Sequence, residues 1–303
     1  IATFPTAHRA SCTRNQGSGA IIEMSGKPDN WMAMVPDTLR WDFIGLDTRY
    51  RLADGRTRRR HYLDSAASTL ALRGARQVAD ELLRHYANTH SELHFSARVV
   101  GHAYDWAHAQ VLKFVQADPE HHVAFFAGSG CTALLNRLAR TLAARRPERD
   151  VVLVSLMEHH ANDLPHRRHA GQVVHLPLTG VAPALGTIDL AALEQCLEQY
   201  RGRVNYLAVS AASNVTGIVN PVHDIAALAH AFGAWVVVDA SQSLAHLLLP
   251  LSDTGSSDRE LDAVVFSGHK LYAPGSPGAA VTRRTLLEDT EPDEVGGGMV
   301  DDV

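Results

Sequence analysis

The stretch Ala263-Val264-Val265-Phe266-Ser267-Gly268-His269-Lys270 joins an apolar run to a short polar segment that ends in a lysine. Lysine is rare in this chain, since it occurs only at positions 27, 113 and 270. A lysine amine can form a Schiff base when its surroundings lower its pKa, whereas the guanidinium of arginine cannot. We therefore interpret Lys270 as a candidate reactive amine at the end of a buried strand. The alternative is an ordinary lysine that reaches solvent.

Similar apolar runs recur along the chain and alternate with helical patterns. Strands are predicted at residues 61–64, 123–126, 151–154, 173–176, 206–209, 235–238 and 263–266. Apolar spacing predicts helices at residues 71–87, 97–117, 132–145, 189–200 and 222–232. Continuous apolar strands that alternate with helices predict an α/β fold, in which a mainly parallel sheet is covered on both faces. Ligands bind such sheets outside the carboxyl ends of the strands.

The strand 123–126 leads into the loop Ala127-Gly128-Ser129-Gly130-Cys131-Thr132 and then into a helix. Glycines let backbone N–H groups approach an anion, and the start of a helix favours negative charge. This loop suits a phosphate, although it lacks the pattern of a nucleotide triphosphate loop. The alternative is an ordinary turn between a strand and a helix.

Two other strand ends carry a histidine and an acid. The strand 151–154 leads to His159, whose flat ring could lie over a planar ligand or simply be exposed; a zinc pair with the adjacent His160 fits less well, because neighbouring side chains point apart. The strand 235–238 ends in Asp239, with Gln242 three residues on. A buried acid needs a cation or hydrogen bonds, which a protonated ring nitrogen would satisfy. The alternative is an aspartate that caps a helix.

Taken together, these strand ends suit a phosphorylated pyridine aldehyde, which requires a lysine amine and an acid for its ring nitrogen. The net charge of −5 gives no indication of a nucleic-acid partner, and no apolar run approaches the roughly 20 residues of a membrane span. The basic run 56–60 is therefore interpreted as a solvated loop. The sparse cysteines, Cys12, Cys131 and Cys196, argue against a disulfide framework and suit a reducing cytoplasm. We expect no metal site.

From residue 61 onward the chain resembles the class V aminotransferase family of pyridoxal-phosphate enzymes, and is most similar to its cysteine desulfurase and selenocysteine lyase branch. The matching segments are YLDSAAST (62–69), ANTH (87–90), GSGCT (128–132), EHHAN (158–162), SNVTGIVNPV (213–222), VVVDASQSLAH (236–246), SGHK (267–270) and GGGM (296–299). The resemblance implies a large domain of fold type I with a seven-stranded type of sheet. It also implies pyridoxal 5′-phosphate as cofactor, a small amino acid as substrate, a homodimer, and a sulfur-acceptor protein as a further partner.

The resemblance also implies a role for each matching residue. Lys270 would hold the cofactor as an aldimine, Asp239 would pair with the ring nitrogen, Gln242 would contact the phenolic oxygen and His159 would stack on the ring. The phosphate would lie among Gly130, Cys131, Thr132, Ser267 and His269. The cofactor and substrate would also contact Asn214, and the entrance would be lined by Ala66 and His90.

The chain departs from the family pattern at several positions. The phosphate loop reads Gly130-Cys131-Thr132-Ala133 instead of Gly-Thr-Thr-Glu, and the lost hydroxyl should weaken phosphate binding by about 1 kcal/mol. Residues 88–92 differ from the closest desulfurases, and His166 stands where tryptophan is usual. These differences leave the substrate open, and Cys12 and Cys196 match no family position.

We expect residues 1–60 to form a partly irregular extension and residues 61–303 to form the cofactor-binding large domain. The family's smaller C-terminal domain, with its carboxylate-binding arginine and persulfide cysteine, would lie outside this sequence. The leading hypothesis is cleavage of a C–S or C–Se bond, in which Lys270 removes the proton from the substrate α-carbon. The alternatives are an aminotransferase, another lyase of the same class, and a truncated chain that binds the cofactor without catalysis.

Overall fold

The computed structural model describes residues 37–89, 91–180, 186–252, 255–288 and 290. Contacts divide the chain into a unit of residues 1–39 and a unit of residues 40–303, and the description below concerns the second. Several predictions lie outside the described residues: the first part of the expected extension (residues 1–36), which contains Cys12, then His90, and the motif at 296–299. The domain boundary at residue 60 stays a prediction.

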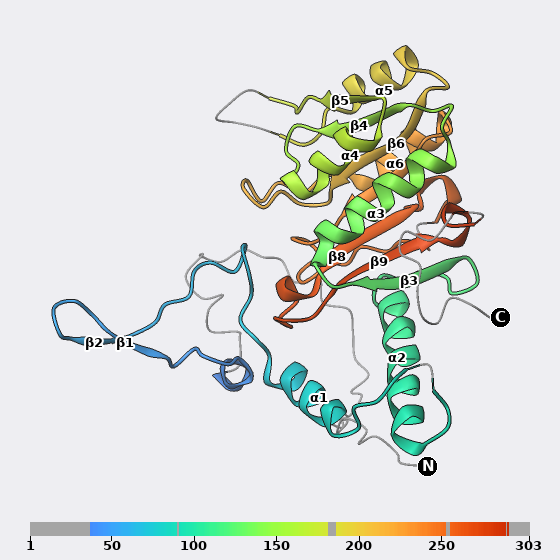
Figure 1. Cartoon of the computed structure of the whole chain (residues 1–303). Coiled ribbons are helices and arrows are strands. Elements are labelled where there is room, and N and C mark those ends of the chain that lie inside the picture. Colours follow the sequence, from blue (N-terminus) through green and yellow to red (C-terminus); the bar gives the residue numbers. More distant parts are fainter. Residues whose placement is uncertain (1–36, 90, 181–185, 253–254, 289, 291–303) are drawn as a thin grey trace, which may run out of the picture. The chain divides into compact units, whose positions relative to one another are not determined.

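A seven-stranded sheet forms the centre of this unit (Figure 1). Its strands are β3 (His122–Ala127), β4 (Val151–Ser155), β5 (Gln172–Leu176), β6 (Val204–Ser210), β7 (Trp235–Asp239), β8 (Ala263–Ser267) and β9 (Gly278–Arg283), in the order β3-β9-β8-β7-β6-β4-β5. Strands β5, β4, β6, β7 and β8 pair in parallel, whereas β9 runs antiparallel to both β3 and β8. The prediction of a mainly parallel α/β sheet is therefore confirmed.

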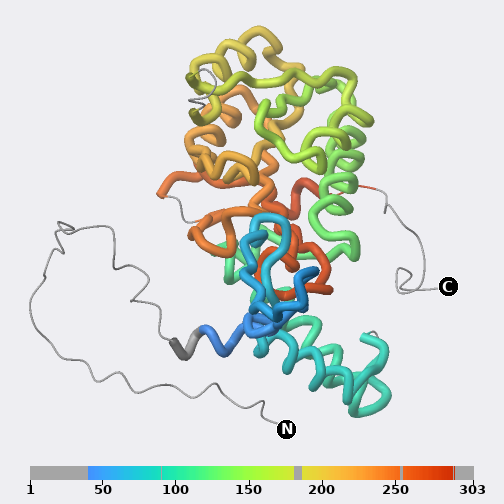
Figure 2. Tube along the Cα trace, turned by 90° about the vertical axis from the view of Figure 1, so that its left-hand side faces the viewer, coloured from blue at the N-terminus to red at the C-terminus, as the bar shows by residue number. Residues whose placement is uncertain are grey.

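Helices cover both faces of the sheet because its strands are apolar on both sides. Along β4, Val151 and Leu153 pack in one core cluster, and Val152 and Val154 pack in another. The first cluster includes residues of α5 (Leu190–Gln199) and α6 (Val222–Ala231), and α2 (Phe95–Phe114) packs against it. The second cluster includes residues of α3 (Gly130–Arg145), which has α4 (Leu164–His169) beside it. In Figure 2, α3 in green and α5 and α6 in yellow to orange lie on opposite sides of the sheet.

The segment before the sheet is short of regular structure. It contains a 3-10 turn, η2 (Asp37–Asp42), an exposed hairpin of β1 (Arg49–Arg51) and β2 (Thr57–Arg59), and helix α1 (Arg73–Arg84). The basic run that we interpreted as a loop thus lies largely on the exposed strand β2. The further 3-10 turns are η3 (His160–Asn162), η4 (Ser257–Arg259), η5 (Gly268–Lys270) and η6 (Arg284–Leu286). None of the described helices is long and apolar enough to cross a membrane.

The strand predictions need two corrections, because one predicted strand does not form and one observed strand was not predicted. Residues 61–64 form no strand; instead the Tyr62 hydroxyl donates a hydrogen bond of 2.5 Å to the Ser68 carbonyl, which folds the segment into a turn. Leu63 is 93% exposed there, so the apolar residue that suggested a buried strand finds no core. Strand β9 was missed, because Gly278-Ala279-Ala280 lacks the branched and aromatic residues that mark a strand.

Candidate functional site

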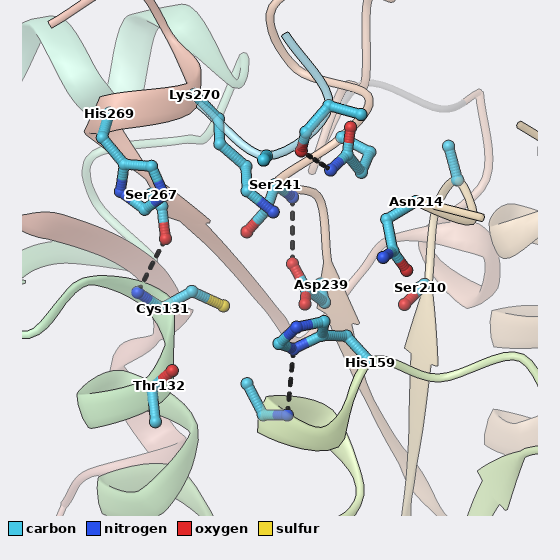
Figure 3. Close-up of a pocket in the computed structure, with 15 residues that line it drawn as sticks. Cys131, Thr132, His159, Ser210, Asn214, Asp239, Ser241, Ser267, His269 and Lys270 are labelled. Carbon is cyan, nitrogen blue, oxygen red and sulfur yellow. Dashed lines mark hydrogen bonds between the residues drawn. The ribbon is translucent and has the colours of Figure 1, made fainter. Parts of the chain in front are cut away.

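A cavity of ≈ 400 Å³ opens at the carboxyl ends of β3, β4, β6, β7 and β8 (Figure 3). Ten of the predicted residues line it: Ala66, Cys131, Thr132, His159, Asn214, Asp239, Gln242, Ser267, His269 and Lys270. Figure 3 shows Cys131, Thr132 and Ser267 on one side, Asn214 on the other, and Lys270 and Asp239 between them. Gly130 adjoins the cavity without lining it, and His90 lies outside the described residues.

The loop after β3 turns sharply into α3 at Gly130, which begins the helix with φ +67°. A side chain is disfavoured at that φ, and a Cβ there would also lie 3.1 Å from the Ser267 Oγ. The next residue, Cys131, donates its backbone N–H to the same Ser267 Oγ at 2.9 Å. The end of β8 therefore holds the first turn of α3 in place. This turn lies beside the cavity, and the backbone N–H groups at the start of a helix have no partner within the helix.

Strand β9 approaches this loop more closely than a side chain would allow. A Cβ on Gly278 would lie 2.4 Å from the carbonyl carbon of Gly130 and 2.7 Å from its Cα. Gly278 pairs with both Ala127 of β3 and Ser267 of β8, so its position is fixed by the sheet. Glycine at 278 is thus what lets the loop rest directly on the sheet edge.

The thiol of Cys131 faces the cavity in place of the hydroxyl that the family pattern predicts. Burial raises its pKa well above the ordinary value, and the neighbouring Asp239 raises it further. The thiol is therefore protonated at neutral pH and is a weaker hydrogen-bond donor than a hydroxyl.

Asp239 ends β7 in a buried position, and the lysine follows β8 on η5. The Asp239 Oδ1 accepts the backbone N–H of Ser241 at 2.9 Å, so the aspartate caps a turn and not a helix. Lys270 is partly buried on the same cavity. Burial, together with the charge of Lys270, lowers the pKa of His269, which favours a neutral imidazole beside the amine.

His159 follows β4 and is held at the start of η3, where its Nδ1 accepts the Ala161 N–H at 3.1 Å. The residue before it, Glu158, anchors this turn beneath the cavity. Its carboxylate accepts hydrogen bonds from the Ser155 hydroxyl, from Asn162 Nδ2 at 2.6 Å, and from the Ser210 N–H and hydroxyl at 2.8 and 2.5 Å. Burial raises the pKa of Glu158 to about 7, although these hydrogen bonds lower it.

His166, the residue where the family pattern has tryptophan, extends this network into the core. Its Nε2 lies 3.2 Å from Asn162 Oδ1, and its Nδ1 lies 2.8 Å from the Tyr206 hydroxyl. Because Asn162 already donates to Glu158, its oxygen accepts from Nε2–H, so Nδ1 accepts from tyrosine. Burial lowers the pKa of His166 to about 4, in agreement with this neutral form.

Five lining residues were not predicted: Ala67, Ala161, Ser210, Ala212 and Ser241. Ser210 and Ser241 lie next to predicted features, since Ser210 ends β6 and Ser241 follows Asp239 by two residues. The sequence could have indicated Ser241, because an aspartate side chain commonly accepts a hydrogen bond from the backbone N–H of the residue two positions later. Gln242, by contrast, was predicted, and its Nε2 donates to the Ala66 carbonyl at 2.7 Å across the cavity mouth.

Known proteins of one family resemble this chain in sequence and in fold. Residues 61–303 match the family model described as aminotransferase class-V. A probable cysteine desulfurase of Halalkalibacterium halodurans is 31% identical over 246 residues, and a cysteine desulfurase of Dickeya dadantii is 35% identical over 250 residues. These matches cover 79% and 80% of this chain, and 57% of each relative.

Solved structures of cysteine desulfurases also resemble this chain in fold. A cysteine desulfurase from Escherichia coli is 30% identical with a TM-score of 0.66, and the match covers 88% of this chain and 62% of that one. An apo cysteine desulfurase from Thermococcus onnurineus has a TM-score of 0.68 at 26% identity, covering 80% and 58%. The chain thus spans less than two thirds of the length of these relatives.

Proposed function

Because the chain belongs to the aminotransferase class-V family, we propose that its cavity binds pyridoxal 5′-phosphate. The observation that carries the proposal is that one cavity combines three groups suited to this cofactor. The start of α3 offers N–H groups to a phosphate, the buried Asp239 offers a carboxylate to a protonated ring nitrogen, and Lys270 offers a primary amine.

The remaining lining residues would orient the ring and the substrate. His159 would lie against the ring face, and Gln242 would contact the phenolic oxygen from the cavity mouth. Thr132, Ser267 and His269 would complete the phosphate site together with Gly130 and Cys131. The substrate would meet Asn214, Ala66 and His90.

When bound, pyridoxal phosphate supplies an aldehyde that combines with amines and a ring that accepts an electron pair. Lys270 would bind the cofactor through its amine and would later take the proton from the α-carbon of a small amino acid. Asp239 would keep the proton on the ring nitrogen, because a buried carboxylate is stabilised by a cation. The neutral His269 would leave the amine of Lys270 without an added positive neighbour.

We further propose cleavage of a C–S or C–Se bond, since the relatives named above are cysteine desulfurases. In this proposal, the sulfur passes to an acceptor protein and the reaction takes place in the cytoplasm, which suits the sparse cysteines.

A homodimer is part of the same proposal. Helix α1 buries none of its residues, and its Leu83 is 64% exposed, while Trp106 of α2 is 60% exposed. Large apolar side chains that are exposed on these two helices suit a contact with a second copy. Light scattering during gel filtration should give twice the chain mass for the parent and a monomer for Leu83→Glu, and a monomeric parent would contradict the proposal.

The reaction is tested with the purified chain, pyridoxal phosphate, L-cysteine and a dithiol reductant, which supplies the two electrons that convert the released sulfur into sulfide. Equal amounts of sulfide and alanine would support desulfuration, and Lys270→Ala should form neither. Alanine that appears only when pyruvate is supplied would indicate an aminotransferase. Cofactor binding with no product from either substrate would leave a cofactor-binding protein and overturn the proposed reaction.

A further inference from the structure

The backbone around Lys270 is held from outside by a segment about 200 residues earlier in the chain. Thr69, which is 5% exposed, donates its hydroxyl to the His269 carbonyl at 2.9 Å. The same hydroxyl accepts the backbone N–H of Tyr272 at 2.8 Å. The backbone N–H of Thr69 also donates to the His269 carbonyl, at 3.2 Å. One buried side chain therefore joins the residue before Lys270 to the residue two positions after it.

The backbone at Tyr272 requires such support. Its φ is +62°, in the left-handed region that a bulky residue rarely adopts. Its N–H is held by Thr69, and its carbonyl accepts the N–H of Leu72 at 2.9 Å. Residues held in sparsely populated conformations persist when the surrounding structure determines them, and they gather at functional sites.

The supporting segment also touches the other end of the cavity. Ala66, three residues before Thr69, accepts the hydrogen bond from Gln242. A shift of residues 66–72 would thus change the positions of the Lys270 and Gln242 side chains together.

We propose that Thr69 is a positioning residue that sets the direction of the Lys270 amine by fixing the backbone on both sides of it. This inference rests on the proposed function, because it concerns the use of Lys270 toward pyridoxal phosphate. Thr69 itself contacts neither cofactor nor substrate in this account.

The test uses two ligands that differ in their need for the lysine. Pyridoxal 5′-phosphate combines with the amine, whereas pyridoxamine 5′-phosphate has no aldehyde and binds without it. Thr69→Val keeps the size of the side chain and removes both hydroxyl hydrogen bonds. It should weaken the binding of pyridoxal phosphate about tenfold and leave that of pyridoxamine phosphate within about twofold of the parent. The pH midpoint of the visible absorbance band should also differ from the parent value.

Two matched variants separate positioning from stability. Thr69→Ser retains the hydroxyl and should restore binding of pyridoxal phosphate to within about twofold. Thr282→Val makes the same change at a fully buried threonine of β9, whose hydroxyl has no partner among the described residues, and should leave both ligands unaffected. Should Thr69→Val fail to fold, Thr69→Cys offers a weaker hydrogen-bonding group and should show a smaller loss for pyridoxal phosphate alone.

Equal weakening of both ligands, or no change in either, would overturn the positioning role. A parent chain that binds neither ligand would instead contradict the proposed function, and the inference would fall with it.

Discussion

Replacing Gly278 with alanine should push the phosphate loop away from the sheet. The new Cβ would lie 2.4 Å from the carbonyl carbon of Gly130 and 2.7 Å from its carbonyl oxygen. Carbon atoms in contact are normally about 3.5 Å apart or more, so one partner has to move by about 1 Å. Strand β9 is paired on both sides at this position, and the loop is therefore the part that yields.

The expected loss has two components. Inserting a methyl group into a close-packed contact typically lowers the free energy of unfolding by about 1–3 kcal/mol. The displaced loop also pulls the Cys131 N–H away from Ser267 and moves the start of α3. We expect the dissociation constant of pyridoxal phosphate to rise about tenfold, the equivalent of one weakened charge-assisted hydrogen bond.

The assay measures cofactor affinity by absorbance and stability by urea unfolding, side by side. Gly74→Ala is the control, because Gly74 lies in the first turn of α1 and the added Cβ would meet no other part of the described structure within 4 Å. It should raise stability by at most about 0.5–1 kcal/mol. A Gly278→Ala variant with the affinity and stability of the parent would refute the close approach of β9 to the loop.

Three further predictions follow from the site. Burial raises the pKa of Glu158 from 4.5 to about 7, so the folded state binds the Glu158 proton more tightly than the unfolded state does. The stabilisation from this proton is complete below about pH 4.5, and about 3 kcal/mol of unfolding free energy is lost as the pH rises to about 7. Urea unfolding of Glu158→Gln should show no such loss with pH, and a variant with the pH profile of the parent would contradict the role of Glu158. Ser267→Ala should lower unfolding free energy by about 1–3 kcal/mol, because the Cys131 N–H loses its partner; an unchanged melting temperature would disagree. Cys131→Thr should tighten pyridoxal phosphate binding by about 1 kcal/mol, and weaker binding in titrations would show that the thiol serves another purpose.

Much of the sheet could be predicted because its strands are continuous apolar runs. Val151 to Val154 and Val236 to Val238 pack on both faces, which leaves no ambiguity about their burial. Strand β9 could not be predicted in this way, since its first residues are small. The strand expected at 61–64 was wrong, because pairing with a neighbour decides whether a short extended segment becomes a strand.

The cavity residues could be predicted where each one lies at or shortly after the end of a strand. Asp239 ends β7, while His159 and Lys270 lie in the turns that follow β4 and β8, and the parallel sheet brings them to one edge. The groups that support these residues could not be predicted. The Thr69 hydroxyl accepts a hydrogen bond from Tyr272, which lies about 200 residues later in the chain. Glu158 gains its partners on Ser210 only when β4 and β6 lie side by side. Such contacts depend on tertiary structure, which spacing along the chain does not encode.

The central claim is that Lys270 is the residue that combines with pyridoxal phosphate. The chain is incubated with the cofactor, reduced with borohydride, digested and analysed by mass spectrometry. Lysine occurs only at positions 27, 113 and 270, so each candidate can be distinguished. The account predicts a pyridoxyl adduct on Lys270 that disappears in Lys270→Ala. An adduct of equal yield on Lys113, or no adduct on Lys270, would contradict it.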